Sequence, residues 1–228
     1  TGGLADGRSY IGNLDLKEER SNELVVGLTS TVGDFFIAPQ IFYKRVDDYI
    51  QGAPSTNMVA NMVSTMMTGQ AALEWSNVDA EIYGMDLAWR LQLSEDVSLD
   101  GIATAVRGRR TDISDDLYRL APYNGSVGLT YQQETWSLKT ELVAYAKQDK
   151  VAVYNEESAT PGYELLNVAF VWQALPSLRL EGRVDNLFDA TYQEHVAGIN
   201  RAAGSDIAVG ERLYGGERSL SVGVRFSF

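Results

Sequence analysis

The sequence contains no cysteine and only one histidine, His195. The absence of cysteine excludes a disulfide framework, a zinc–thiolate site and a cysteine nucleophile. With one histidine, the chain cannot build a histidine-based metal cluster by itself. No apolar run reaches the ~18 residues that a transmembrane helix requires. We find no credible set of acid, base and nucleophile, so the chain is predicted not to be an enzyme.

Basic residues are scarce relative to acidic ones. The chain has 19 Lys and Arg against 31 Asp and Glu, which gives a net charge of −12. Nucleic-acid binding needs a basic surface, so no nucleic-acid partner is expected. The first ten residues, TGGLADGRSY, lack the basic start and apolar core of a signal peptide. They read as the middle of a protein rather than its start.

What the sequence does contain is a repeated two-residue periodicity, clearest in its last ten residues, SLSVGVRFSF. Leu220, Val222, Val224 and Phe226 form an apolar face, and small or polar residues form the other, which is typical of a β-strand. Eight earlier segments also read as strands, although Pro39 weakens one of them. We therefore predict an all-β chain. The nine segments are approximately 23–32, 35–49, 79–94, 97–109, 122–133, 135–148, 163–174, 177–185 and 219–228.

The connections between these segments alternate strictly between short and long. The short ones lie at 33–34, 95–96, 134 and 175–177, and the long ones at about 50–78, 110–121, 150–162 and 186–217. Outer-membrane β-barrels alternate in this way because their periplasmic turns are short and their extracellular loops long. Most segments also approach the ~9–11 residues that cross a bilayer with tilt. This predicts a transmembrane antiparallel β-barrel, with a soluble all-β sandwich as the alternative.

The strand count and the last residue refine this prediction. Nine strands is an odd number, whereas bacterial single-chain barrels have even numbers. Unless one strand is hidden in a loop, residues 1–228 are therefore the C-terminal part of a longer barrel, with about nine or ten of its strands. The terminal aromatic resembles the signal of outer-membrane proteins that the barrel-assembly machinery reads. We assign Phe228 to this signal, with Phe226 and Val224 facing outer-membrane lipid.

Two segments carry a family resemblance. RVDNLFDATYQEH (183–195) resembles the NLFD-containing segment of TonB-dependent outer-membrane receptors, and FYKRVDDYIQG (42–52) resembles another part of their barrel. STNMVANMVSTMM (55–67), NVDAEIYGMDLAW (77–89) and GINRAAGSDIAVGER (198–212) are similar to the copper-receptor subfamily. The resemblance implies a 22-strand barrel closed by a plug domain, which this chain lacks. It also implies coupling to the TonB system through that plug.

Four methionines in the longest loop are candidate metal ligands. Met58, Met62 and Met66 are four residues apart, so on a helix at about 57–68 they share one face, with Met67 beside them. Thioethers are soft ligands that suit Cu(I) and not calcium or magnesium. The alternative is that these flexible side chains pack the loop onto its neighbours.

His195 follows the NLFD segment and is a second candidate metal ligand, because imidazole also suits copper. The alternative is a solvated or hydrogen-bonded loop histidine. With the resemblance, these residues predict an energy-coupled receptor that takes up copper as its transported ligand, without a cofactor. Uptake of another ligand, such as a ferric siderophore, and a soluble all-β binding module are the alternatives.

Overall fold

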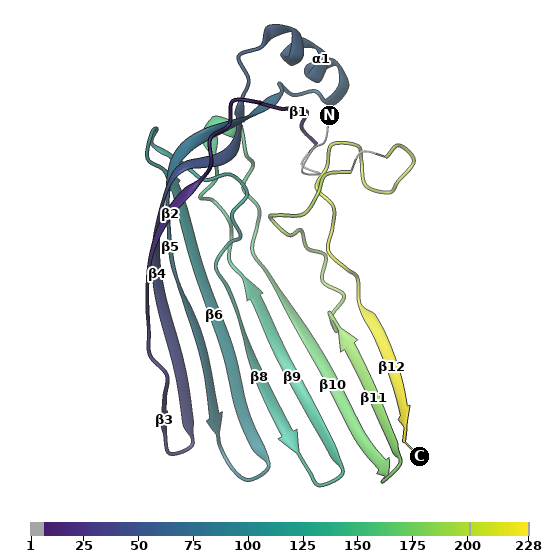
Figure 1. Cartoon of the computed structure of the whole chain (residues 1–228). Coiled ribbons are helices and arrows are strands. Elements are labelled where there is room, and N and C mark those ends of the chain that lie inside the picture. Colours follow the sequence, from purple (N-terminus) through teal and green to yellow (C-terminus); the bar gives the residue numbers. More distant parts are fainter. Residues whose placement is uncertain (1–6, 201, 228) are drawn as a thin grey trace.

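The structure is a computed structural model that describes residues 7–200 and 202–227. These residues form one curved sheet, which confirms the all-β class (Figure 1). Nine strands follow one another across it in the order β12-β11-β10-β9-β8-β6-β5-β4-β2, each antiparallel to its neighbour. A sandwich needs two packed sheets, so the sandwich alternative is wrong. The strands are β2 (Arg20–Gly27), β4 (Phe35–Pro54), β5 (Leu73–Gln92), β6 (Val97–Arg110), β8 (Asn124–Gln132), β9 (Trp136–Tyr145), β10 (Tyr163–Leu175), β11 (Leu178–Asp185) and β12 (Ser219–Phe226).

We call these nine strands the wall. They correspond one to one to the nine segments expected from the alternation. Three short strands pair at their margins: β1 (Tyr10–Ile11) with β5, β3 (Ser30–Val32) with β4, and β7 (Asp115–Asp116) with β6. The other elements are the helix α1 (Met58–Thr68) and the short 3₁₀ helix η1 (Val153–Asn155). Among the described residues, no helix is long and apolar enough to cross a bilayer.

The strands β4 and β5 are longer than expected, at 20 residues each. Their pairing continues past a bulge between Val46 and Tyr49 and ends at Pro54 opposite Leu73. The loop expected at about 50–78 is therefore shorter, because its outer parts extend the two strands. The bulge contains Asp48, whose φ of 59° shows how the chain accommodates the extra residue.

Pro39 lies inside β4 rather than at its end, and its effect falls on the neighbouring strand. Leu28 donates its backbone N–H to the carbonyl of Pro39 at 3.0 Å. Proline has no N–H to return to Leu28, so the ladder is interrupted between β2 and β3. The register is the same on both sides of this gap, because Gly27 pairs with Gln40 and Ser30 with Ile37.

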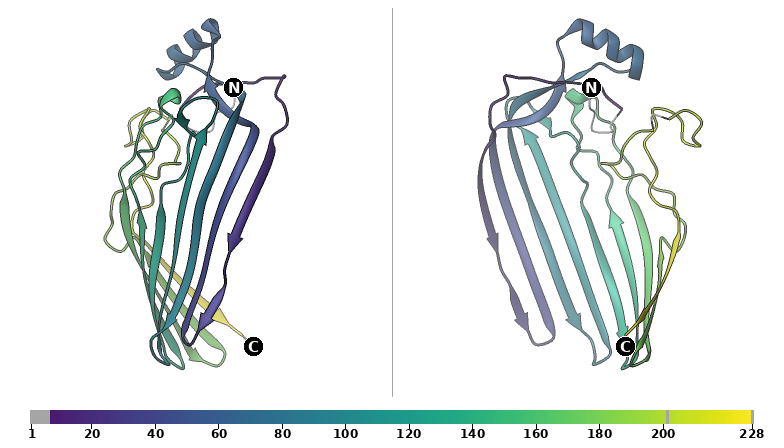
Figure 2. Two further views of the ribbon diagram at one scale, coloured as in Figure 1. Left: turned by 90° about the vertical axis from the view of Figure 1, so that its left-hand side faces the viewer. Right: turned by 45° about the vertical axis from the view of Figure 1, so that its right-hand side comes forward.

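The two ends of the wall differ, as the alternating connections predicted. Short turns join the strands at one end, and long connections with α1 gather at the other (Figures 1 and 2). We call the segments at the long-connection end the loop layer; it comprises residues 7–19, 55–72, 111–123, 146–162 and 186–218. Ion pairs such as Lys139 to Asp100 at 3.0 Å lie on the concave face of the wall, and apolar side chains such as Val127 and Leu129 lie on the other.

The buried apolar residues lie at or near the loop layer. Val46, Ala80 and Leu117 form the hydrophobic cluster, with Ile82 and Leu120 packed against it. Tyr10, Ala72 and Leu73 are also buried, and the rings of Tyr10 and Trp75 lie 5.0 Å apart. The long segments are therefore held in place by a small core that they share with the upper ends of β4 and β5, and they form a fixed surface above the strands.

Candidate functional site

The helix α1 has well-defined ends, which explains why a short segment is helical. Asn57 caps its start, since the side-chain oxygen accepts the N–H groups of Val59 and Ala60 at 3.1 Å. Gly69 ends it with φ of 77°, and its N–H bonds to the carbonyl of Thr65 at 3.0 Å. The cap and the glycine fix which residues turn toward the protein.

The face of α1 that lies on the protein is polar. Ser64 is fully buried and donates to the carbonyl of Gln70 at 2.8 Å. Asn61 donates to the carbonyl of Ser55 at 2.8 Å and accepts the N–H of Ala72 at 3.1 Å. These bonds tie α1 to its own flanking segments, so its apolar side chains are left on the other side.

The four methionines are exposed on that other side. The exposed fractions of Met58, Met62, Met66 and Met67 are 84%, 60%, 82% and 76%. Side chains that packed the loop onto its neighbours would be largely covered, and these are not. The helix therefore presents a row of thioethers outward, together with Val59 and Val63. Met67 and the two valines also line a shallow hollow of about 300 Å³ beside Tyr10.

His195 lies in the last long loop and is buried. Its Nδ1 is 3.0 Å from the hydroxyl of Thr160, and its Nε2 is 3.1 Å from a carboxylate oxygen of Glu157. Glu157 also accepts the N–H groups of Arg119 and Ala152 at 2.9 Å. Both imidazole nitrogens are therefore occupied, and His195 would have to break one of these bonds to bind a metal ion.

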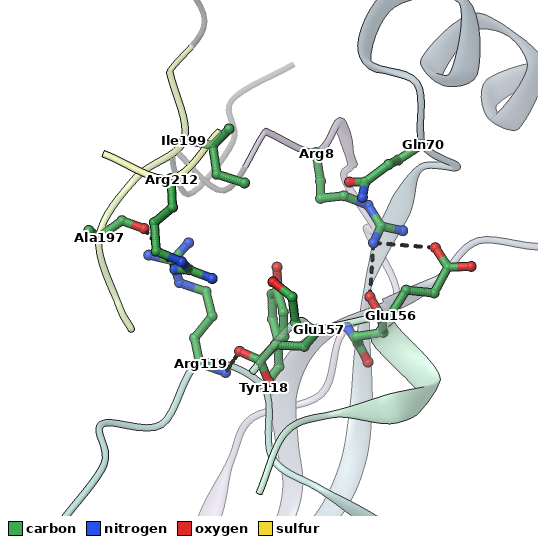
Figure 3. Close-up of a pocket in the computed structure, with 11 residues that line it drawn as sticks. Arg8, Gln70, Tyr118, Arg119, Glu156, Glu157, Ala197, Ile199 and Arg212 are labelled. Carbon is green, nitrogen blue, oxygen red and sulfur yellow. Dashed lines mark hydrogen bonds and ion pairs between the residues drawn. The ribbon is translucent and has the colours of Figure 1, made fainter. Parts of the chain in front are cut away.

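A polar pocket of about 60 Å³ lies between the loops (Figure 3). Arg8, Arg119 and Arg212 reach it from three different segments, and Glu156, Glu157 and Tyr118 also line it. Gln70, which follows α1, lines one side, whereas Ala197 and Ile199, which follow His195, line the opposite side (Figure 3). His195 bonds to Glu157 of this pocket, whereas none of the four methionines lines it.

The arginines of this pocket are held mainly by backbone carbonyls. Arg8 donates to the carbonyls of Ala71 and Asn155 at 2.9 Å, and Arg119 and Arg212 donate to carbonyls of the last loop. Burial lowers the pKa of Arg212, and the charge of nearby Arg119 lowers it further. Arg8 is also ion-paired with Glu156 at 3.8 Å. Arg119 and Arg212 are fixed by carbonyls, and with three arginines against Glu156 and Glu157 the pocket keeps positive charge that can attract an anionic group.

Sequence reasoning missed this pocket. Its residues come from segments far apart in the chain and follow no motif. A buried carboxylate such as Glu157 could not be told from a solvated one without the fold. Within residues 7–200 and 202–227, no group of three or more His, Asp and Glu side chains is arranged to hold a metal ion.

Two of the three residues assigned to the assembly signal, Val224 and Phe226, lie in β12. Val224 and Phe226 are 68% and 60% exposed and pair in register with Leu180 and Leu178 of β11. They lie on the apolar face of the wall, as the alternation predicted. Phe228 lies outside the described residues.

Comparisons with known proteins give the chain a family. Residues 2–187 match the family described as "TonB dependent receptor-like, beta-barrel". The chain is 26% identical over 213 residues to the ferrienterobactin receptor of Escherichia coli K12, a match that covers 85% of this chain and 28% of that protein.

Solved structures share the fold at lower identity. The copper transporter OprC superimposes with a TM-score of 0.82 at 22% identity, over 95% of this chain and 34% of that one. A ferric enterobactin receptor, PfeA from Pseudomonas aeruginosa, gives 0.67 at 19%, over 98% and 34%. The chain spans about a third of the length of these proteins. By its sequence match and its fold, it belongs to the TonB-dependent receptor-like β-barrel family of the bacterial outer membrane.

Proposed function

We propose that the chain is the C-terminal barrel part of a TonB-dependent receptor and that the receptor takes up copper. Coupling to TonB would act through a plug domain outside this chain. The observation that carries the proposal is the capped helix α1, which holds four methionines exposed at the long-loop end of the wall. In this family the long loops face the outside of the cell, where a ligand arrives.

The chemistry of these side chains favours a soft ion. Met58, Met62 and Met66 offer only thioether sulfur, which suits Cu(I) and is a poor ligand for hard cations. This chain has no cysteine and so offers no competing thiolate of its own. Exposed methionines on a short helix can each turn toward an ion, since the methionine side chain is unbranched and flexible.

If His195 is also a copper ligand, it must first give up one of its two hydrogen bonds. The hydrogen bond between the imidazole Nε2 and the carboxylate of Glu157, which accepts it, must open before that nitrogen can bind a metal ion. This would separate the loop that contains Glu157 from the loop that contains His195. In this proposal, α1 captures copper and His195 would act only after the two loops part.

The test replaces Met58, Met62 and Met66 by leucine in the receptor and measures Cu(I) affinity by chelator competition, together with copper uptake by cells. Met85→Leu is the matched control, because Met85 is the one methionine of the chain outside the helix and lies on the wall. We expect the triple variant to lose at least tenfold in affinity and the control to lose nothing. Unchanged copper uptake in the triple variant would remove α1 from the proposal.

A second candidate is uptake of an anionic metal chelate such as a ferric siderophore. The observation that favours it is the convergence of Arg8, Arg119 and Arg212 on one polar pocket. At about 60 Å³ the pocket is too small for a whole chelate, but it can hold one anionic group. Arg119→Gln with Arg212→Gln would then reduce uptake of the ferric chelate and leave copper uptake unchanged. Unchanged uptake of the ferric chelate in this variant would rule out the arginine pocket as its binding site.

A further inference from the structure

The convex face of the wall has a level at which apolar side chains give way to charged ones. On β6, Leu99, Ala103 and Ala105 lie on this face, and Arg107 and Arg109 follow on the same side toward the loop layer. Arg107 pairs in register with Tyr83 of β5. In a barrel that spans a bilayer, an aromatic row beside an apolar band marks the lipid–water interface. Arg107 therefore lies at headgroup depth, on the outer-leaflet side.

A hollow of about 500 Å³ opens at this level. It is lined by Tyr83, Arg107, Arg109, Asp116, Tyr123 and Lys150, which we call the rim hollow. The Arg107 guanidinium lies over the Tyr123 ring, 4.2 Å from its centre, and Nε donates to the Tyr123 hydroxyl at 2.6 Å. These contacts fix the orientation of the Arg107 guanidinium at one side of the rim hollow.

The charge of the rim hollow is opposite to that of the chain. The hollow has three cationic side chains and one carboxylate, Asp116, whereas the whole chain has a net charge of −12. Within the described part of the chain, neither Arg109 nor Lys150 makes an ion pair. By contrast, Arg45, on the same face at the upper part of β4, is paired with Asp47 at 3.4 Å.

An apolar hollow adjoins the rim hollow. It shares Tyr83, Arg107 and Tyr123 with it, continues over Ile41, Met85 and Ala105, and has a volume of about 310 Å³. Ile41 and Met85 are 58% and 44% exposed. A cationic hollow joined to an apolar one at the bilayer interface fits an amphiphile with an anionic headgroup and acyl chains. A free anion would use only the first.

We propose that the rim hollow binds the phosphate group of an outer-leaflet glycolipid. The outer leaflet of bacterial outer membranes is built of phosphorylated glycolipid, which is the lipid this face meets at headgroup depth. Guanidinium groups bind phosphate through paired N–H donors, and a lysine adds a point charge. Basic clusters beside a membrane-spanning surface attract anionic headgroups in the same way. An acyl chain then lies along Met85 and Ala105.

The test uses the receptor purified from outer membranes in mild detergent. The test variant is Arg109→Gln with Lys150→Gln. In the described parts of the chain, neither side chain makes a hydrogen bond that the fold could lose, so we expect normal folding by heat-dependent gel mobility. Phosphorylated glycolipid retained per receptor, counted by native mass spectrometry, should fall at least fivefold. Arg45→Gln is the control and should retain the wild-type amount. Unchanged retention in the double variant would overturn the proposal.

Add-back to delipidated receptor identifies the recognised group. The three probes are phosphorylated glycolipid, the same glycolipid after dephosphorylation, and inorganic phosphate. We expect only the first to bind, and the double variant to weaken it. Equal binding of the dephosphorylated lipid would rule out phosphate recognition, and competition by inorganic phosphate at equal concentration would rule out the lipid as the source. Copper binding should be the same in all arms, because α1 is unchanged.

Discussion

The wall and the loop layer are stabilised by different physics. In the middle of the wall, Val127, Leu129 and Leu142 are 47%, 44% and 45% exposed, and the wall is a single sheet. The loop layer and the strand ends beneath it contain the fully buried side chains, including Leu73, Leu117 and Asn155. One region relies on its strand ladder and on lipid, and the other relies on a core.

This difference implies that the wall and the loop layer respond differently to mutation. A wall whose apolar side chains face lipid gains little from internal packing, so it tolerates change wherever its alternation is kept. The loop layer resembles a small soluble protein, with a hydrophobic cluster and buried hydrogen bonds such as those of Glu157 and His195. Both candidate sites lie in this layer. Changes in the layer should therefore alter ligand binding without unfolding the wall.

The largest expected effect is on the core of the loop layer. Leu117→Ala removes a side chain that is 1% exposed and packs against Val46 and Ala80. Loss of a buried leucine costs about 2–5 kcal/mol, so the segment 111–121 should open far more often. Hydrogen exchange at the Leu117 amide, which bonds to Gly108, measures this opening. Ile113→Ala, in the same segment but 36% exposed, is the control. If Leu117→Ala lowered the free energy of unfolding of the whole wall by the same amount, the distinction between the two regions would be wrong.

A charge on the lipid side of the wall should have the next largest effect. Val127→Arg puts a guanidinium into the apolar face of β8 and should destabilise the folded protein in liposomes by about 2–4 kcal/mol. Ser126→Arg, one residue away, points to the concave face and should cost under about 1 kcal/mol, because that face is polar. Urea unfolding of both variants compares the two faces directly. Equal costs would contradict the assignment of Val127 to the lipid side.

Most of the wall could be predicted from the sequence because its signal is local. The alternation in segments such as 178–185 and the short turns between strands depend only on neighbouring residues. The extension of β4 to Pro54 could not be predicted, because it depends on pairing with residues 73–78 across the chain. Proline predicts a weakened strand at Pro39, but in the structure the missing N–H affects the pairing with Leu28 and leaves β4 continuous.

The loop layer was harder to predict because its contacts are not local. The methionine spacing was visible, but the exposure of α1 depends on the polar contacts of Asn61 and Ser64. The partners of His195 lie 35 and 38 residues away, so no spacing could have indicated them. The arginine pocket joins Arg8 to Arg212, from nearly opposite ends of the chain.

A smaller effect is expected at the start of α1. Asn57→Ala removes the side-chain cap of two backbone N–H groups and should cost about 1 kcal/mol of local helix stability. Exchange at Val59 and Ala60 should rise several-fold, while the wall is unchanged. Thr56→Ala, the exposed neighbour, should leave these rates as they are. If the cap positions the methionines, Cu(I) affinity should fall in the first variant only.

The smallest expected effect concerns the pH dependence of the stability of the loop layer at the point where it joins β6. Arg110, the last residue of β6, donates to Asp112 at 3.0 and 2.5 Å, and these bonds hold the pKa of the Asp112 carboxyl below its usual range. A depressed pKa means that the carboxylate stabilises the fold above the usual range and loses this effect as pH falls through the folded value. Asp112→Asn should therefore destabilise the segment 111–121 at pH 7, by under about 1 kcal/mol because the carboxylate is partly exposed.

Below about pH 4, where the unfolded carboxyl is protonated, the wild type and Asp112→Asn should converge. Exchange at Thr111, which bonds to Asp79, measures the segment across this range. Asp206→Asn, at an exposed loop position, should show no such convergence because it should not differ at pH 7. A difference between wild type and Asp112→Asn that is constant with pH would mean that the amide's shape, and not the charge, matters. In that case the segment 111–121 would be stabilised by packing alone, and the charge of Asp112 would contribute nothing to the difference between the loop layer and the wall.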